Sequence, residues 1–200
     1  MKEELVSQSV VLPGGGLTLL QPRESAELPD AGGVAWAPAV PYWSVLWRSG
    51  VALARELDAL DLRGKRVVEL GCGLAVPSIA AARGGAEALA TDWDWEALTL
   101  ARRNAEANGI ELETMQVDWR RPDELINRGP FDLVLAADLF YEQEGVELLL
   151  DLLPRLAPEA WAADPGRDKS AAFFDVAERR GWPTELRSRG VVDIHLLRLA

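Results

Sequence analysis

The sequence has very little of the chemistry that disulfides and metal sites require. Its 200 residues include one cysteine, Cys72, and one histidine, His195. A single cysteine excludes an internal disulfide, and with a single histidine it leaves no expected zinc cluster, so no metal site is predicted. The first residues are acidic and do not resemble a secretion signal. Together these features predict an intracellular protein, most simply a cytoplasmic one.

Long hydrophobic runs and an excess of positive charge are also missing. No apolar stretch approaches the ~20 residues of a membrane-spanning helix, so no membrane partner is expected. The chain has 21 lysines and arginines against 32 aspartates and glutamates, a net charge of −11. This charge disfavours nucleic acid as a partner and suits a basic substrate, although acidity can also serve solubility alone.

A length of 200 residues suits one domain with a full core, and the hydrophobic content of 48% is ordinary for a globular protein. Residues 1–33 are predicted to be an N-terminal extension with a β-hairpin, whose glycine-rich turn covers residues 13–16. A loop is expected over 22–33. The domain then spans residues 34–200 and begins with a helix over 43–57.

From residue 62 onward, strand and helix patterns alternate. This predicts a doubly wound, mostly parallel, seven-stranded Rossmann-like sheet with helices on both faces. The predicted strands are 66–70, 86–91, 111–117, 131–137, 159–163, 184–188 and 192–198. The predicted helices are 76–84, 95–108, 143–156 and 169–180. Ligands of such sheets bind at the carboxyl ends of the strands. The polar turns there are therefore site candidates, although Asp164-Pro165-Gly166-Arg167 can equally be a plain turn.

The stretch Glu69-Leu70-Gly71-Cys72-Gly73 follows the first predicted strand. Two glycines in a tight turn let a ligand approach the main chain, which is typical of a nucleotide-like cofactor site. A dinucleotide would need a third glycine where Val76 stands, and Glu69 would repel its pyrophosphate. S-adenosylmethionine carries a sulfonium and an ammonium group but no phosphate. The acidic residue therefore favours S-adenosylmethionine as the cofactor.

Polar residues after the next two strands extend this hypothetical site. Asp92 is expected to accept from the ribose hydroxyls, with Asp94 as the alternative unless it caps the following helix. Asp118 and Trp119 form a pair suited to adenine, because the carboxylate can accept from the exocyclic amine and the indole can stack on the ring. Trp43 and Trp47 can each be read either as core packing or as pocket lining.

Asp138 and Tyr141 follow the fourth predicted strand, which is expected beside the first. Methyl transfer from a sulfonium requires a lone pair held in line with the methyl group, so the protein contributes mainly positioning. Asp138 can orient a neutral amine by accepting from its N–H, and Tyr141 can hydrogen-bond either partner. The alternative is that Asp138 caps the next helix and Tyr141 belongs to the core. We predict these two residues as the catalytic pair.

These motifs together resemble the seven-β-strand class I S-adenosylmethionine-dependent methyltransferases. The combination of Glu69–Gly73 with Asp138–Tyr141 is similar to the protein-lysine methyltransferase branch that includes the enzymes acting on the β subunit of electron transfer flavoprotein. The resemblance implies that Asp138 and Tyr141 lie at the methyl acceptor. It implies cofactor contacts from Trp47, Gly71, Cys72, Gly73, Asp92 or Asp94, Trp119 and Ala137.

The implied activity is N-methyl transfer by a monomer to a lysine of a protein substrate, for which the electron transfer flavoprotein β subunit is one candidate. A small-molecule amine is the alternative acceptor, and a non-catalytic domain that binds S-adenosylmethionine or only a partner is a further alternative. Two glycines of the family pattern are replaced by Ala75 and Ser78, which are small enough for a cofactor site to persist. The first thirty or so residues lie outside the resemblance, and substrate choice is expected there.

Overall fold

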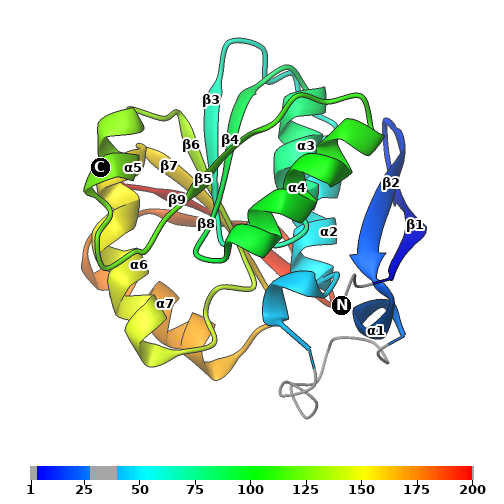
Figure 1. The fold of residues 1–200 in the computed structure, drawn as a ribbon. Helices are drawn as coiled ribbons and strands as arrows, with labels where there is room; N and C mark the ends of the chain where they lie inside the picture. Colours follow the sequence, from blue (N-terminus) through cyan, green and yellow to red (C-terminus); the bar gives the residue numbers. More distant parts are fainter. Residues whose placement is uncertain (1–3, 28–39, 200) are drawn as a thin grey trace.

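A seven-stranded sheet forms the centre of the protein (Figure 1). The computed structural model describes residues 4–27 and 40–199. The strands of the sheet are β3 (Arg66–Leu70), β4 (Glu87–Asp92), β5 (Glu113–Gln116), β6 (Leu133–Ala137), β7 (Glu159–Asp164), β8 (Thr184–Ser188) and β9 (Asp193–Arg198). They lie in the order β5-β4-β3-β6-β7-β9-β8, and β9 runs antiparallel to both of its neighbours while the other pairs are parallel. This confirms the predicted doubly wound, mostly parallel sheet.

Helices cover both faces of the sheet, as predicted. Figure 1 shows α2 (Arg48–Leu57), α3 (Val76–Arg83) and α4 (Trp95–Ala107) on one side, and α5 (Asp123–Arg128), α6 (Gln143–Leu156) and α7 (Asp168–Arg179) on the other. Neighbouring residues of β3 belong to different cores: Val67 packs in the cluster of Leu53 and Ile79, whereas Val68 packs in the cluster of Leu149 and Phe173. Because β3 is covered on both faces, its neighbouring residues Val67 and Val68 are both apolar.

Three local elements differ from the predictions. The helix expected over 43–57 begins only at Arg48, and a 3-10 turn, Tyr42–Ser44, precedes it. Between them Trp47 is extended, and its indole N–H donates to the Tyr42 carbonyl oxygen at 2.9 Å. The helices α5 and α1 (Arg23–Ala26) were not expected, because they are too short to show a helical period. Residues 28–33 of the predicted loop lie outside the described residues.

The strands β1 (Leu5–Leu12) and β2 (Gly15–Pro22) form a separate antiparallel hairpin. Leu17 and Leu19 of β2 are buried in the same core cluster as α2, α3 and α4. The buried Asn104 side chain of α4 accepts a hydrogen bond from the Leu20 N–H at 2.7 Å. The hairpin is therefore packed onto the main core. The predicted boundary between residues 33 and 34 falls outside the described residues and stays a prediction.

Within the part of the chain that the structure describes, no cluster of three or more histidine, cysteine or acidic side chains is arranged to hold a metal ion. In the same residues no helix is both long enough and apolar enough to cross a bilayer. Burial raises the pKa of the Cys72 thiol, which keeps it protonated. The half-buried His195 stacks on Phe174, with the ring centroids 4.0 Å apart. His195 therefore has the surroundings of a packing residue.

Candidate functional site

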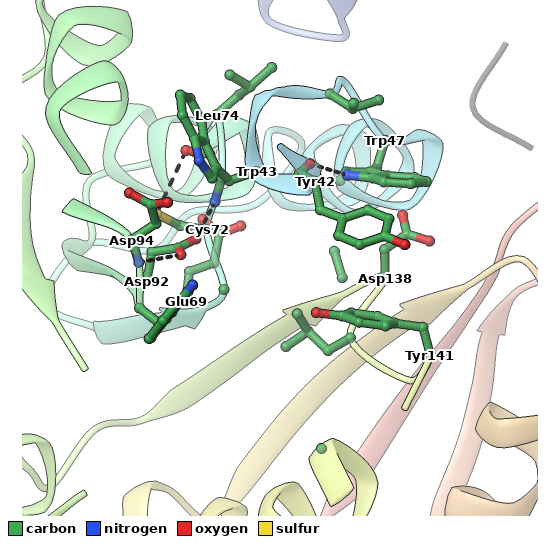
Figure 2. A pocket seen from close by; sticks show the side chains of 18 of the residues that line it. Tyr42, Trp43, Trp47, Glu69, Cys72, Leu74, Asp92, Asp94, Asp138 and Tyr141 are labelled. Atoms are coloured by element: carbon green, nitrogen blue, oxygen red, sulfur yellow. Dashed lines mark hydrogen bonds between the residues drawn. The ribbon is translucent and has the colours of Figure 1, made fainter. Parts of the chain in front are cut away.

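A cavity of about 540 Å³ lies at the carboxyl ends of the central strands (Figure 2). The strand order reverses between β3 and β6, which is where doubly wound sheets bind ligands. All twelve residues predicted as site residues line this cavity. They are Trp47, Glu69, Gly71, Cys72, Gly73, Asp92, Asp94, Asp118, Trp119, Ala137, Asp138 and Tyr141. The structure therefore brings them together, while their individual roles stay predictions.

The glycine turn after β3 has no room for side chains. Gly71 and Gly73 have φ angles of 57° and 48°, a left-handed conformation that side chains disfavour. A Cβ atom on Gly71 would lie 2.6 Å from Cδ2 of Leu139, and one on Gly73 would lie 2.9 Å from the Trp43 carbonyl oxygen. The Cys72 N–H between them donates to the Thr91 carbonyl oxygen at 2.8 Å. The turn is thus pinned to β4 and leaves bare backbone facing the cavity.

The two acidic residues at the end of β4, Asp92 and Asp94, are both bound by backbone amides. The buried Asp92 accepts from the Gly73 N–H at 2.9 Å and from the Asp94 N–H at 3.0 Å. Burial raises the pKa of the Asp92 carboxyl, and the hydrogen bonds oppose that rise. Asp94 is the N-cap of α4, since its side chain accepts from the Glu96 N–H at 2.8 Å. The structure thus gives Asp94 the capping position that the sequence had left as one of its alternatives.

Glu69 is buried beneath the glycine turn and is bound by Ser78, one of the residues that replace family glycines. The Ser78 N–H donates to Oε2 of Glu69 at 2.9 Å, and the Ser78 hydroxyl donates to the same oxygen. Burial raises the pKa of Glu69 to about 8. The carboxyl is then largely protonated near pH 7, and a cation bound beside it would favour its ionised form. The other replacement, Ala75, takes a left-handed φ of 60° at the N-cap of α3.

Asp118 and Trp119 line the wall of the cavity beyond β5. The Asp118 carboxylate accepts from the Arg120 N–H at 3.0 Å, and its side chain is 44% exposed. Trp119 is half-buried and packs against the core under α5 and α6. Trp119 is therefore anchored in the core, and the Asp118 carboxylate remains at the edge of the cavity.

Asp138 does not cap the next helix and Tyr141 does not lie in the core, which were the alternative positions predicted for these two residues. α6 begins at Gln143 with Glu142 at its N-cap, so Asp138 is not the capping residue. Asp138 is buried instead, with Oδ1 at 2.7 Å from Nη1 of Arg167 and Oδ2 accepting from the Ser49 N–H at 3.2 Å. Tyr141 is 50% exposed, so it is not a core residue. Burial raises the pKa of both side chains.

Aromatic rings surround the Asp138 end of the cavity. Figure 2 shows Tyr42, Trp47 and Tyr141 around the Asp138 carboxylate. The Tyr42 ring centroid lies 5.7 Å from that of Tyr141 and 6.2 Å from that of Trp47. These rings form an apolar rim above a buried acidic group. Such a rim suits an aliphatic chain that ends in a nitrogen atom.

Several residues of the cavity were not among the predicted site residues. Arg167 is the most important, because it bridges Asp138 and Asp164, and only a polar turn could be predicted at that position. Tyr42 and Trp43 lie in an aromatic segment whose side chains could equally have been core. The indole N–H of Trp43 is buried and has no hydrogen-bond partner among the described residues, which leaves one donor for a bound ligand.

Solved structures of other proteins share this fold. A 16S rRNA N2 G1207 methyltransferase of T. Thermophilus, in complex with AdoMet and guanosine, superposes with a TM-score of 0.71 at 16% identity, covering 98% of this chain and 51% of that chain. The ribosomal protein L11 methylase of Lactobacillus delbrueckii subsp. bulgaricus has a TM-score of 0.60 at 23% identity, over 76% of this chain and 79% of that one. The fold is that of the class I methyltransferases, which confirms the predicted fold class.

The family described as lysine methyltransferase matches residues 20–179, so this chain belongs to the lysine methyltransferase family. It is 38% identical over 141 residues to the electron transfer flavoprotein beta subunit lysine methyltransferase of Xenopus laevis, covering 66% of this chain and 55% of that protein. The human protein of the same name is 32% identical over 178 residues, covering 82% of this chain and 63% of its own length. The chain thus spans little more than half the length of these relatives. The resemblance predicted from the motifs is confirmed.

Proposed function

We propose that this protein transfers a methyl group from S-adenosylmethionine to a lysine side chain of a protein. One observation carries the proposal: the turn Gly71–Gly73 and the segment Asp138–Tyr141 open into the same cavity. The first is suited to a nucleoside cofactor and the second to an acceptor amine. Membership of the lysine methyltransferase family supports the same activity.

The residues present fit S-adenosylmethionine. When bound, this cofactor supplies a methyl group on a positively charged sulfur. Bare backbone at Gly71 and Gly73 leaves space for it, and the buried Trp43 N–H is a free donor among the described residues. Asp92 and Asp118 offer carboxylate oxygens at separate strand ends, and these suit ribose hydroxyls and an adenine amine. Cofactor contacts are further assigned to Trp47, Glu69, Cys72, Trp119 and Ala137, with Asp94 as the alternative to Asp92.

At the other end of the cavity, Asp138 holds the acceptor. A lysine amine has a pKa near ~10.4, so removing its proton at pH 7 costs about 4.6 kcal/mol, from ~3.4 units at ~1.36 kcal/mol each. Only the neutral amine has the lone pair that attacks the methyl group. Asp138 accepts one N–H of this amine, while the rings of Tyr42 and Tyr141 pack against its carbon chain and exclude water.

The choice of a protein acceptor draws on the relatives and on charge. Relatives of this chain are named for lysine methylation of the electron transfer flavoprotein β subunit, which is one candidate substrate. The net charge of −11 suits a basic acceptor segment and disfavours nucleic acid. We extend the proposal to a monomeric, cytoplasmic enzyme, to be tested by light scattering and cell fractionation. A small-molecule amine as acceptor, and a non-catalytic binding domain, are the competing functions.

The test uses S-adenosylmethionine labelled on its methyl group. The purified protein is incubated with a lysate of its own organism, beside Asp138→Asn and the control Asp151→Asn. Asp151 pairs with Arg180 outside the cavity. A labelled protein band that is lost only in Asp138→Asn supports the proposal, and lysine is then sought in the band by mass spectrometry. Label confined to small molecules would favour the small-molecule activity. Binding of S-adenosylhomocysteine without any label would favour a non-catalytic domain.

A further inference from the structure

Three charged side chains meet at the acceptor end of the cavity. Nη1 of Arg167 lies 2.7 Å from Oδ1 of Asp138 and 2.7 Å from Oδ2 of Asp164. The side chains of Arg167, Asp138 and Asp164 are 20%, 8% and 2% exposed. One guanidinium thus joins two carboxylates in a site that is largely removed from water, where charge-assisted hydrogen bonds are strong.

The direction of Arg167 is set by the turn that carries it. Oδ1 of Asp164 accepts from the N–H groups of Gly166 and Arg167, both at 2.8 Å. Gly166 has a φ of 86°, which closes this turn. The guanidinium carbon also lies 6.0 Å from the centre of the Trp47 ring. Arg167 is therefore held on three sides and is not a mobile surface arginine.

Both oxygens of Asp138 already have donors. Arg167 binds Oδ1, and the backbone N–H of Ser49 at the start of α2 binds Oδ2 at 3.2 Å. A carboxylate has about four lone-pair sites, so Asp138 can still accept one N–H from an incoming amine. The two existing contacts hold the carboxylate in one orientation, so they determine from which direction the amine can donate.

A buried carboxylate on its own would bind a lysine as the ammonium ion and keep it protonated. Methyl transfer requires the opposite state. We propose that Arg167 is a positioning residue that holds the Asp138 carboxylate and offsets its charge, so that the acceptor lysine binds as the neutral amine. This inference rests on the proposed function, because it concerns the acceptor of the same cavity.

Other charged or titratable groups face the same end of the cavity. Tyr141 and Glu142 follow Asp138, and Tyr42 comes from the 3-10 turn. Asp92 acts on Tyr141 from the end of β4. On α2 the charged neighbour of Ser49 is Arg48, which is exposed. Most of these groups are acidic or neutral. Arg167, the cation that contacts Asp138, therefore has a large influence on the protonation of the acceptor amine.

The first arm of the test measures the pKa of the Asp138 carboxyl directly and requires no methyl transfer. In the wild type, burial raises the pKa of Asp138 and Arg167 lowers it. Carboxyl ¹³C NMR of Arg167→Met should show the pKa of Asp138 raised by about one unit or more, and Arg167→Lys should restore most of the difference. The control is Arg180→Met, because Arg180 also pairs with a carboxylate, that of Asp151, and lies 5.8 Å from a tryptophan ring, outside the cavity. An unchanged pKa of Asp138 in Arg167→Met overturns the proposal.

The second arm measures methyl transfer to lysate protein against pH. Arg167→Met should lose roughly tenfold in kcat at pH 7.5 and regain it at higher pH, because the acid limb of the profile moves up by about one unit. Its affinity for S-adenosylhomocysteine should stay near that of the wild type, and Arg167→Lys should be intermediate in rate. A loss of the same size at every pH would show a merely structural role and overturn the proposal. If the wild type labels no protein while the Asp138 titration still shifts, the proposed function fails and the charge compensation stands.

Discussion

Ser78 donates both its backbone N–H, at 2.9 Å, and its hydroxyl to a single oxygen of the buried Glu69. This contact links the start of α3 to the strand that carries the glycine turn. In the family pattern a glycine stands at this position, and a glycine could supply only the backbone donor. The serine therefore adds a hydrogen bond that lowers the pKa of a carboxyl which burial has raised.

Glu69 should make stability depend on pH. Burial raises the pKa of Glu69 to about 8 in the folded protein, against about 4.3 in an unfolded chain. Between these values the folded state binds more protons, so the free energy of unfolding falls as the pH rises through this range. Glu69→Gln removes that loss. Its stability relative to the wild type should improve by on the order of 4 kcal/mol between pH 5 and pH 9, measured by urea unfolding. Parallel curves for the two proteins would contradict the burial argument.

Gly71→Ala should weaken cofactor binding. Its Cβ would lie 2.6 Å from Leu139, and the left-handed φ of 57° adds strain, of about 1–2 kcal/mol. We expect the affinity for S-adenosylhomocysteine to fall at least ~tenfold in calorimetry, since Leu139 must move into the cavity. Gly109→Ala is the control, because Gly109 has a φ of 70° and a Cβ added there would meet no atom within 4 Å. Equal affinities in the two variants would mean that the turn does not face the cofactor.

Substitutions of Asp92 and Asp94, the two acids at the end of β4, should have different effects on stability and on cofactor affinity. Asp94→Ala removes the N-cap of α4, which should cost about 1 kcal/mol of stability and leave cofactor affinity nearly unchanged. Asp92→Ala removes the acceptor of the Gly73 N–H and should weaken S-adenosylhomocysteine binding ~tenfold or more. Thermal unfolding and calorimetry on both variants provide the comparison. A larger affinity loss in Asp94→Ala would transfer the ribose role to Asp94.

Asn104→Ala should test whether the hairpin unfolds with the domain. The buried Asn104 accepts from the Leu20 N–H and donates to the Leu74 carbonyl oxygen at 3.2 Å, so it joins the hairpin to the glycine turn. Losing both bonds should cost about 2–4 kcal/mol, because buried groups are left without partners. The control is Asn108→Ala, a less buried neighbour that also binds β2. A small loss confined to hairpin amides in hydrogen exchange would mean that the hairpin opens independently.

Most of the predicted site residues came from one rule of the parallel sheet, and Trp47 came from the aromatic segment and the family resemblance; all of them line the cavity. Asp92, Asp118 and Asp138 follow different strands and are far apart in sequence. Their strands run in the same direction, so the residues after them must meet at one edge. The sequence alone therefore predicts that these residues share one site, without knowledge of any contact between them.

Loop contacts could not be obtained in this way. From the sequence, Asp94 could either bind the ribose or cap a helix, and Asp138 could either act in catalysis or cap a helix. The alternatives differ only in where a short turn directs a side chain, and that direction depends on partners such as Arg167 and Ser49. Trp47 was likewise placed inside a helix, although its hydrogen bond to Tyr42 holds it outside.

The sequence by itself determined the order of the strands and of the longer helices, the glycine turn and the side chains at the strand ends. Apolar periodicity and glycine chemistry act over a few residues, so they can be read locally. The tertiary structure alone decided that Arg167 pairs with Asp138, that Tyr42 faces Tyr141 and that Ser78 binds Glu69. These contacts join separate loops and helix ends, and their geometry follows from how the whole core packs rather than from any local pattern.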